Sequence, residues 1–220
     1  MDLLKIIVAV VGAYLIGAIP SAYLMGRLNG FDIRAYGSGN VGATNLMRVL
    51  GRKWGLACLA FDIAKGFLPV ALLFPFEWFA DLLARADAAG LWLQLWPWLI
   101  GVCAILGHMF SPFLKFRGGK GVATSLGVAL AIIPWAVLSV LILALLLIWL
   151  SGYVSLGSVV GAAVLPFLVL AYNINDGPWV KFGVALLLGL LIIFKHRANI
   201  RRLREGTEQR WTERIGRQSD

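Results

Sequence analysis

The amino-acid sequence predicts an all-α polytopic membrane protein with seven short transmembrane helices. The chain has 220 residues, of which 60% are hydrophobic, and its mean hydropathy is +0.83, far above the range of soluble domains. Apolar runs long enough to enter a bilayer recur along the chain, and short polar loops separate them. Most Lys and Arg residues lie in these loops, where positive charge sets the orientation of a membrane protein.

The first two predicted spans each contain one feature that departs from a plain apolar helix. Residues 6–26 form the first span, and we expect Pro20 to bend it because proline cannot donate to the helical hydrogen-bond ladder. Residues 55–76 form the second span, which is apolar except for Asp62 and Lys65. These two residues are three positions apart and therefore share a helical face, which predicts a buried ion pair.

The third span and the region after it decide how many times the chain crosses the membrane. Residues 91–113 form the third span, and residues 122–150 follow without any charged side chain. If 122–150 crosses twice, broken near Pro134, 16 of the 20 Lys and Arg residues lie on one side, as the positive-inside rule favours. Two passes in so few residues predict thin helices that bring a polar site down into the membrane. An interfacial aromatic belt is expected at Trp92, Trp96 and Trp98.

The remaining spans place the two termini on opposite sides of the membrane. A polar loop at residues 151–158 precedes the sixth span at 159–172, and a turn at 173–178 leads to the seventh span at 179–194. Seven crossings put the N-terminus outside and the C-terminus in the cytoplasm. From residue 195 the chain is basic. The sequence leaves two alternatives for this segment, a short interfacial helix and a disordered segment.

Charge and cysteine usage exclude several classes of protein. The net charge of +9 lies in short blocks between apolar segments, so anionic lipid headgroups and not nucleic acid are the expected partners. Cys58 and Cys103 each lie inside an apolar run without metal-ligand spacing, so neither a disulfide nor a metal site is predicted. We divide the chain into one membrane domain at residues 1–208 and a basic tail at 209–220.

A glycine-rich basic turn, Phe-Arg-Gly-Gly-Lys-Gly-Val-Ala-Thr at residues 116–124, is the strongest candidate for a binding site. Its glycines allow the backbone N–H groups to approach a ligand closely, and the helix that follows adds its positive N-terminal dipole. This combination favours phosphate, although a turn that only sets topology is the open alternative. The candidate residues in the turn are Arg117, Gly118, Gly119, Lys120, Gly121 and Thr124.

A second polar loop, at residues 27–53, contains small hydroxyl and amide side chains followed by an arginine. Such groups orient phosphate and polarise carbonyl oxygens without titrating, whereas a merely structural turn is the alternative. The loop also matches the pattern GxGxxG, but a membrane helix and not a strand precedes it, so we reject a dinucleotide site. The candidate residues are Gly37, Ser38, Asn40, Thr44, Asn45 and Arg48.

The last basic segment adds a titratable group. His196 and Asn199 are three positions apart and share a face if the segment is helical, which suits proton handling beside a hydroxyl or an oxyanion. An interfacial histidine bonded to a carbonyl is the structural alternative. We assign His108, at the end of the third span, mainly to structure.

At these residues the sequence resembles the bacterial acyl-phosphate-dependent glycerol-3-phosphate acyltransferases of integral membranes. The resemblance implies seven short helices in the bacterial cytoplasmic membrane and a site that faces the cytoplasm. It also implies transfer of an acyl group from acyl phosphate to the 1-hydroxyl of glycerol-3-phosphate, giving lysophosphatidate and phosphate with no cofactor and no metal. The segments that carry it are residues 17–21, 37–48, 62–66, 107–124 and 196–208.

The resemblance also assigns roles to particular residues. Ser38, Thr44 and the turn with Lys120 would hold the acyl-phosphate group, and Ser158 would be a further polar wall. Either His196 or the phosphate of the donor would deprotonate the glycerol hydroxyl, and we favour the phosphate. The residues implied to hold and orient glycerol-3-phosphate are Arg48, His196 and Asn199.

The main alternative from another class is a small transporter of phosphate or phosphate esters, which would use the same basic turns. Alternating access needs a site that is reachable from both sides of the membrane, whereas the polar motifs here lie on one predicted face. The spacing of a histidine and an aspartate that is typical of acyl-CoA acyltransferases is absent from the sequence, because Phe113 and Arg201 stand five residues after the two histidines.

Overall fold

A computed structural model describes residues 2–73, 91–172 and 178–212, and all regular secondary structure in these ranges is helical. Four helices are long and apolar enough to cross a membrane, and the number rises to six if each of two bent helix pairs is one span. The all-helical membrane fold is therefore confirmed, whereas the count of seven spans and the side on which each terminus lies stay predictions.

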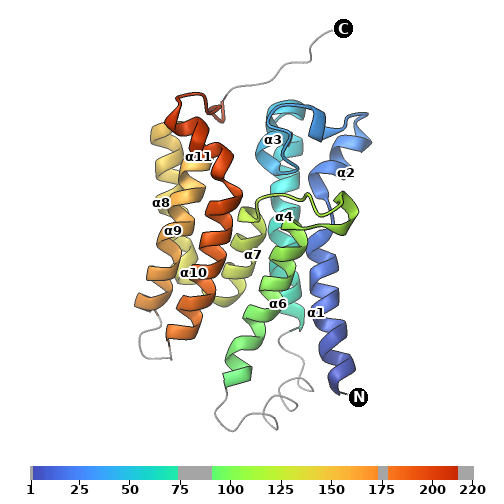
Figure 1. The fold of residues 1–220 in the computed structure, drawn as a ribbon, viewed down its shortest axis with the longest axis vertical. Coiled ribbons are helices and arrows are strands. Elements are labelled where there is room, and N and C mark those ends of the chain that lie inside the picture. The colour runs from blue at the N-terminus through green and yellow to red at the C-terminus, as the bar shows by residue number, and fades with distance from the viewer. Residues whose placement is uncertain (1, 74–90, 173–177, 213–220) are drawn as a thin grey trace.

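The first bent pair follows the expected position of the proline. Helices α1 (Asp2–Ala18) and α2 (Ser21–Leu28) meet at an angle of 42°, and Pro20 lies at the junction. Helix α4 (Arg52–Leu73) returns along α1 toward the end of the bundle where the N-terminus lies (Figure 1). The bend at Pro20 is confirmed, and it directs α2 and the following loop over one end of the bundle.

The polar loop expected at residues 27–53 contains two helical segments, which corrects that prediction. The 3₁₀ helix η1 covers Ile33–Ala35, and the α-helix α3 covers Ala43–Leu50. The buried side chain of Leu46 on α3 packs in one cluster with Ile33 and Cys58. An eight-residue helix between two glycines has little intrinsic stability, so the packing of its apolar face stabilises it.

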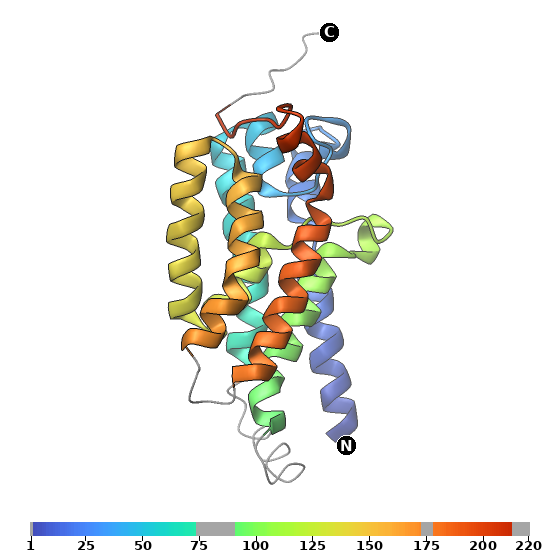
Figure 2. The same cartoon turned by 60° about the vertical axis from the view of Figure 1, so that its left-hand side comes forward.

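The chain breaks near Pro134 as expected. After α6 (Leu91–Met109) and the 3₁₀ helix η2 (Pro112–Leu114), α7 covers Val122–Ile132 and α8 covers Pro134–Ser151. The 11 residues of α7 span only about 16 Å at the α-helical rise. The glycine-rich turn before α7 consequently crosses the bundle below the level of α3 and of the C-terminal helix α11 (Figures 1 and 2).

The last three helices complete the bundle, and the loop before them is shorter than predicted. The loop expected at residues 151–158 is shorter, because Gly152 ends α8 with a φ of 79° and α9 already begins at Val154. Residues 173–177, where a turn is expected, lie outside the described ranges. The basic segment after residue 195 begins with a helix, which decides between the two alternatives for residues 197–204, whereas residues 213–220 lie outside the described ranges. The three last helices are α9 (Val154–Tyr172), α10 (Pro178–Lys195) and α11 (Arg197–Arg204).

Glycine permits a close contact between α4 and α7. A Cβ atom at Gly66 would lie 2.2 Å from the carbonyl oxygen of Thr124, and one at Gly127 would lie 2.0 Å from the carbonyl oxygen of Ile63. Small residues at helix interfaces allow backbones to approach in this way. The N-terminus of α7 is therefore held directly against the middle of α4.

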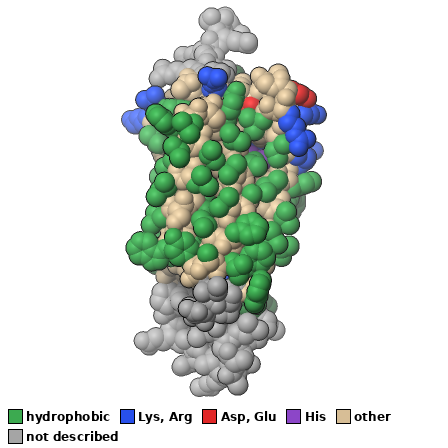
Figure 3. Space-filling view, turned by 90° about the vertical axis from the view of Figure 1, so that its left-hand side faces the viewer, with side chains coloured by type: hydrophobic (Ala, Val, Ile, Leu, Met, Phe, Trp, Pro, Cys, Tyr) green, Lys and Arg blue, Asp and Glu red, His purple; other side chains and the backbone are tan. Residues whose placement is uncertain are grey.

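The exposed surface is that of a membrane protein. On the face shown in Figure 3, hydrophobic side chains cover the sides of the bundle, and Lys and Arg side chains gather at the end where α11 lies. The aromatic belt expected at Trp96 and Trp98 is wrong, because these rings are only 3% and 4% exposed and pack in the core; the Trp92 side chain lies outside the described part. Exposed tryptophans instead mark both ends of α8, at Trp135 and Trp149, about 21 Å apart along the helix.

Candidate active site

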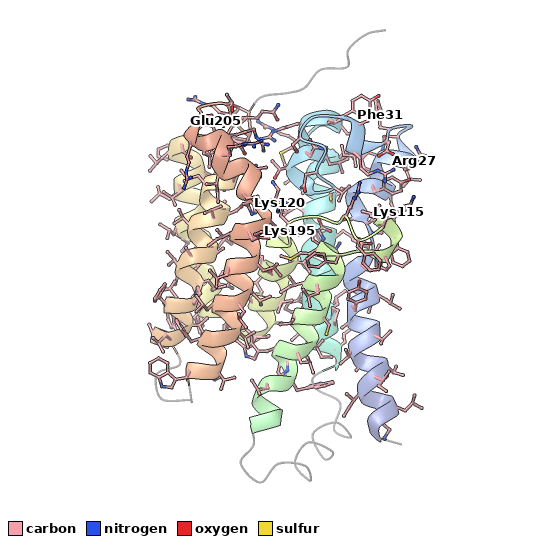
Figure 4. The ribbon with its side chains drawn as sticks, viewed as in Figure 1. Arg27, Phe31, Lys115, Lys120, Lys195 and Glu205 are labelled. Atoms are coloured by element: carbon pink, nitrogen blue, oxygen red, sulfur yellow. The ribbon has the colours of Figure 1, made fainter. Side chains whose placement is uncertain are left out.

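Lys120 joins the glycine-rich turn to the C-terminal part of the chain. Its Nζ donates a hydrogen bond of 2.6 Å to Oδ1 of Asn199 on α11. Figure 4 shows Lys120 and Lys195 in the middle of the bundle, whereas Arg27 and Lys115 lie at its side. The short helix α7 explains this depth, because its N-terminus, and with it Lys120, lies inside the bundle.

The backbone of the glycine-rich turn pairs with the end of α6. The N–H groups of Gly118 and Gly119 donate to the carbonyl oxygens of Met109 and His108, at 3.2 and 3.0 Å. Gly121 then begins α7 in a left-handed conformation, with a φ of 84°, and no side chain caps the helix. The first-turn N–H groups of α7 are thus arranged as at helix N-termini that bind anions.

Asn199 is held by Glu208, which the sequence alone does not single out. Asn199 Nδ2 donates to Glu208 Oε1 at 2.6 Å, and the same carboxylate accepts bonds of 2.8 Å from Ser155 and from Arg202. Burial raises the pKa of Glu208, but these hydrogen bonds outweigh it and lower the pKa overall. The sequence offers no signal that separates Glu208 from Glu205 in the same basic segment, and the partners of Glu208 became visible only in three dimensions.

The electrostatics of Lys120 suit an anion. The pKa of its ammonium group is lowered to about 8, mainly by burial and in part by Arg202 and Arg48, against the opposing effect of Glu208. The guanidinium of Arg48, which is only 8% exposed, donates from Nη2 to the carbonyl oxygen of Gln209 at 2.8 Å. Three cations thus surround one carboxylate, which leaves a net positive field for a phosphorylated ligand.

His196 lies at the junction of α10 and α11 and is buried. Its Nδ1 lies 2.8 Å from the carbonyl oxygen of Ile192, which can only accept, so Nδ1 carries the proton and Nε2 is the acceptor. Burial, and after it the charge of Lys120, lowers the pKa of His196 to about 4. The imidazole is therefore neutral at physiological pH.

The first loop is organised by Asn45. Its Oδ1 accepts the N–H of Ser38 at 3.0 Å, while Nδ2 lies within 3.1 to 3.3 Å of the carbonyl oxygens of Ile33, Tyr36 and Asn40. The amide of Asn45, expected to bind substrate, is thus occupied by the loop backbone. Asn45 holds Ser38 and Asn40 in place.

A cavity of about 850 Å³ lies between the first loop and the glycine-rich turn. Lys120 lines this cavity and also contacts Asn199, so it joins the cavity to the polar cluster of Arg48, His196 and Asn199. Five of the predicted residues line this cavity, and four cations in its lining were not predicted. The predicted lining residues are Asn40, Arg117, Gly118, Gly119 and Lys120, and the additional cations are Arg34, Lys115, Lys195 and Arg197.

Some predicted residues lie elsewhere. Thr124 is fully buried in the contact between α4 and α7, and Ser158 donates to the carbonyl oxygen of Val154 in its own helix at 2.9 Å. Gly37 and Thr44 belong to the first loop and to α3, outside the lining of the cavity. No group of three or more potential metal ligands occurs among the described residues.

Fold and site together define an integral-membrane helical bundle with a basic, glycine-lined polar site near one end. The sequence model of the glycerol-3-phosphate acyltransferase family matches residues 7–206. A glycerol-3-phosphate acyltransferase of Geobacter sulfurreducens is 44% identical over 201 residues, covering 90% of this chain and 94% of the relative. Glycerol-3-phosphate acyltransferase 1 of Deinococcus radiodurans is 45% identical over 212 residues, covering 96% and 98%. The chain therefore belongs to the glycerol-3-phosphate acyltransferase family.

Two solved structures agree with this assignment to the family. The crystal structure of PlsY (YgiH), an integral membrane glycerol 3-phosphate acyltransferase, in its glycerol 3-phosphate form superposes with a TM-score of 0.78 at 35% identity, covering 93% of this chain and 94% of PlsY. The lysophosphatidic acid form gives 0.76 at 34% identity with the same coverage. This membership identifies an acyltransferase and leaves the transporter alternative without support.

Proposed function

We propose that this protein transfers a fatty acyl group from acyl phosphate to the 1-hydroxyl of glycerol-3-phosphate, giving lysophosphatidate and phosphate. The reaction would take place at the cytoplasmic face of the bacterial inner membrane. The observation that carries the proposal is the bond of 2.6 Å between Lys120 and Asn199, because it joins an anion-binding turn to a second polar group. Two phosphorylated substrates need two such groups beside one another.

The donor phosphate is assigned to the cavity side of Lys120. The N–H groups at the start of α7 and the ammonium of Lys120 would hold its oxygens, with Ser38 and Thr44 from the opposite loop. Asn40 and Arg117, which line the cavity, would add further donor contacts, and the glycines of the turn would let its backbone lie close to the phosphate. The acyl chain would extend among membrane lipids, since the outer surface of the bundle is apolar (Figure 3).

Glycerol-3-phosphate is assigned to the cluster of Arg48, His196 and Asn199. Arg48 presents a planar cation to phosphate, and its bond to Gln209 restricts its orientation. His196 Nε2 is an acceptor for a glycerol hydroxyl, because Nδ1 carries the proton. The acceptor alcohol would then lie next to the donor phosphate across Lys120.

In the chemical step, the O1 oxygen of glycerol forms a bond to the acyl carbon, and the bond between that carbon and the phosphate oxygen breaks. Phosphate leaves with the electron pair and with the proton of the hydroxyl. The donor is a mixed anhydride with a good leaving group, so positioning and charge stabilisation by Lys120 suffice without a covalent nucleophile. A histidine with a pKa of about 4 is a weak base, which favours the donor phosphate as the proton acceptor.

The test is acyl transfer by the purified protein, supplied with labelled glycerol-3-phosphate and either palmitoyl phosphate or palmitoyl-CoA. We expect lysophosphatidate from palmitoyl phosphate only, and its loss in Lys120→Ala. Product from palmitoyl-CoA alone would overturn the proposed donor. A pH–rate profile whose acidic limb disappears in His196→Ala, with substrate binding intact, would instead identify His196 as the base.

A further inference from the structure

A buried polar cluster, formed by Ser21, Asp62, Lys65 and His108, lies directly behind the glycine-rich turn. Asp62 Oδ1 accepts a bond of 2.5 Å from Ser21 and forms an ion pair of 2.7 Å with Lys65. His108 Nδ1 lies 3.7 Å from the same oxygen. All four side chains are at most 7% exposed, and because buried ionisable groups inside a membrane are costly, their presence indicates a role.

We propose that His108, which lies beside Asp62, is a positioning residue that sets the place of the glycine-rich turn and hence of the acyl-phosphate site. This inference rests on the proposed function, because it concerns the donor that the turn would bind. It extends the structural role expected for His108 and Asp62 to the binding of one of the two substrates.

The imidazole of His108 lies against the backbone of Gly119. A Cβ atom at Gly119 would lie 2.2 Å from Nε2, 2.9 Å from Cε1 and 3.2 Å from Cδ2 of this ring. Gly119 is not among the glycines with positive φ, so its backbone conformation would accept alanine. The His108 ring is therefore what requires glycine at position 119.

The His108 ring has little room to move away, because it is buried beside a cluster that is itself fastened to other elements. Lys65 Nζ donates 2.8 Å to the carbonyl oxygen of Ile19 at the break between α1 and α2, so α4 is fastened to that break. A cavity of only about 10 Å³ remains between the cluster and the turn. A cavity of this volume holds at most a single water molecule, so displacement of the ring is passed to the turn.

Displacement of Gly119 is in turn passed to Lys120. The N–H of Gly119 is bonded to the carbonyl oxygen of His108 itself, at 3.0 Å, and the next residue contacts Asn199. Among the described residues, neither Asn199 nor its partner Glu208 forms a hydrogen bond with a member of the cluster. A shift of the turn should therefore impair the donor more than glycerol-3-phosphate.

The experiment is a double-mutant cycle on the full-length protein with Gly119→Ala and His108→Asn. Asparagine retains a donor near the position of Nδ1, toward Asp62, but lacks the atoms corresponding to Cε1 and Nε2. We expect Gly119→Ala to raise the KM for palmitoyl phosphate about tenfold or more and the KM for glycerol-3-phosphate by less than about threefold. In the double variant the added effect of alanine should disappear. His108→Ala is tested in the same cycle as a second substitution that removes the ring.

Gly118→Ala is the matched control. Its Cβ would meet the carbonyl oxygen of His108 at 2.1 Å, and this backbone atom remains in every His108 variant. We expect no rescue of Gly118→Ala by His108→Asn. Equal rescue of both alanine variants, or independent effects of His108→Asn and Gly119→Ala on KM, would overturn the inference.

A second readout separates this inference from the proposed function. If the wild-type protein makes no product from palmitoyl phosphate, the proposed donor fails, but the contact is still tested by thermal unfolding in detergent. Gly119→Ala should lower Tm in the wild-type background and not in the His108→Asn background. Equal lowering of Tm in both backgrounds would show that the ring does not determine the position of the turn.

Discussion

At the scale of single residues, the site depends on how burial and neighbouring charge act on Lys120. An ammonium group in water has a pKa near 10.5, but burial lowers the pKa of Lys120 to about 8. Below this pH the group is charged and attracts phosphate. The proximity of Glu208 partly restores the charged form, so the two residues act together although 88 positions separate them in the sequence.

The first prediction concerns the pH dependence of donor binding. Because Lys120 loses its proton as the pH rises through about 8, the KM for palmitoyl phosphate should increase above that pH, by about tenfold per unit well beyond it. Arginine stays protonated throughout, so Lys120→Arg should have a lower kcat but a KM that is independent of pH up to about pH 9. The same rise of KM in the arginine variant would show that another group titrates.

The second prediction concerns Glu208→Gln. Removal of the carboxylate charge takes away the interaction that raises the pKa of Lys120, so the rise in donor KM should begin at lower pH than in the wild type. Glutamine keeps one acceptor oxygen but loses the second one and the ion pair with Arg202, so kcat/KM for glycerol-3-phosphate should also fall by about tenfold. Initial rates across the pH range measure both effects. An unshifted pH dependence with a stable fold would contradict the coupling of Glu208 to Lys120.

At the scale of elements, the segment after α11 closes the site. Thr207 N–H donates to the carbonyl oxygen of Arg202 at 2.8 Å, and Trp211 N–H donates to the carbonyl oxygen of Gly152 at 2.9 Å. Between them, Gln209 holds Arg48. The start of the predicted tail thus packs on α3 and on the turn between α8 and α9, while residues 213–220 lie outside the described ranges.

The third prediction follows from this strap, residues 207–211. The guanidinium of Arg52 lies over the Trp211 ring, 5.8 Å from its centroid, so Trp211→Ala should loosen the strap and with it Arg48. We expect kcat/KM for glycerol-3-phosphate to fall about tenfold, with Trp211→Phe close to the wild type. The neighbouring exposed residue provides the control, since Thr212→Ala should change little. Equal effects of both alanine substitutions would argue against a specific role of Trp211.

At the scale of the whole molecule, the bundle is polar at one end and apolar along its sides. The helices run up and down along the bundle, and the N-terminus lies at the end of the bundle opposite α11 (Figures 1 and 2). The cavity, the first loop, α3, α11 and the strap all lie toward the α11 end. A cytoplasmic donor and acceptor would therefore reach the site from one side only.

The fourth prediction tests this orientation. In a background with Cys58→Ala and Cys103→Ala, a cysteine in place of the exposed Glu205 should react with a membrane-impermeant maleimide only in inside-out vesicles. A cysteine in place of Trp179, which is 70% exposed near the start of α10, is the matched control and should react only in right-side-out vesicles. The opposite pattern would reverse the predicted orientation of both termini.

Local patterns in the sequence determined the membrane class, the bend at Pro20, the break before Pro134 and the ion pair of Asp62 with Lys65. They also determined the glycine-rich turn and the resemblance to the family. Each of these depends on residues near one another in the chain: an apolar run, a missing N–H group, or a spacing of three on a helix. Such features are encoded before any tertiary contact forms.

Tertiary structure alone decided which of these pieces meet. The bond between Lys120 and Asn199 joins residues 79 positions apart, and the burial of Trp96 depends on neighbours in other helices. Similarly, α3 is an α-helix where the sequence indicated only a polar loop, because packing against α4 stabilises eight residues that would not form a stable helix alone. Burial and long-range contacts set both the charge of Lys120 and the role of Glu208, and neither is a property of the local sequence.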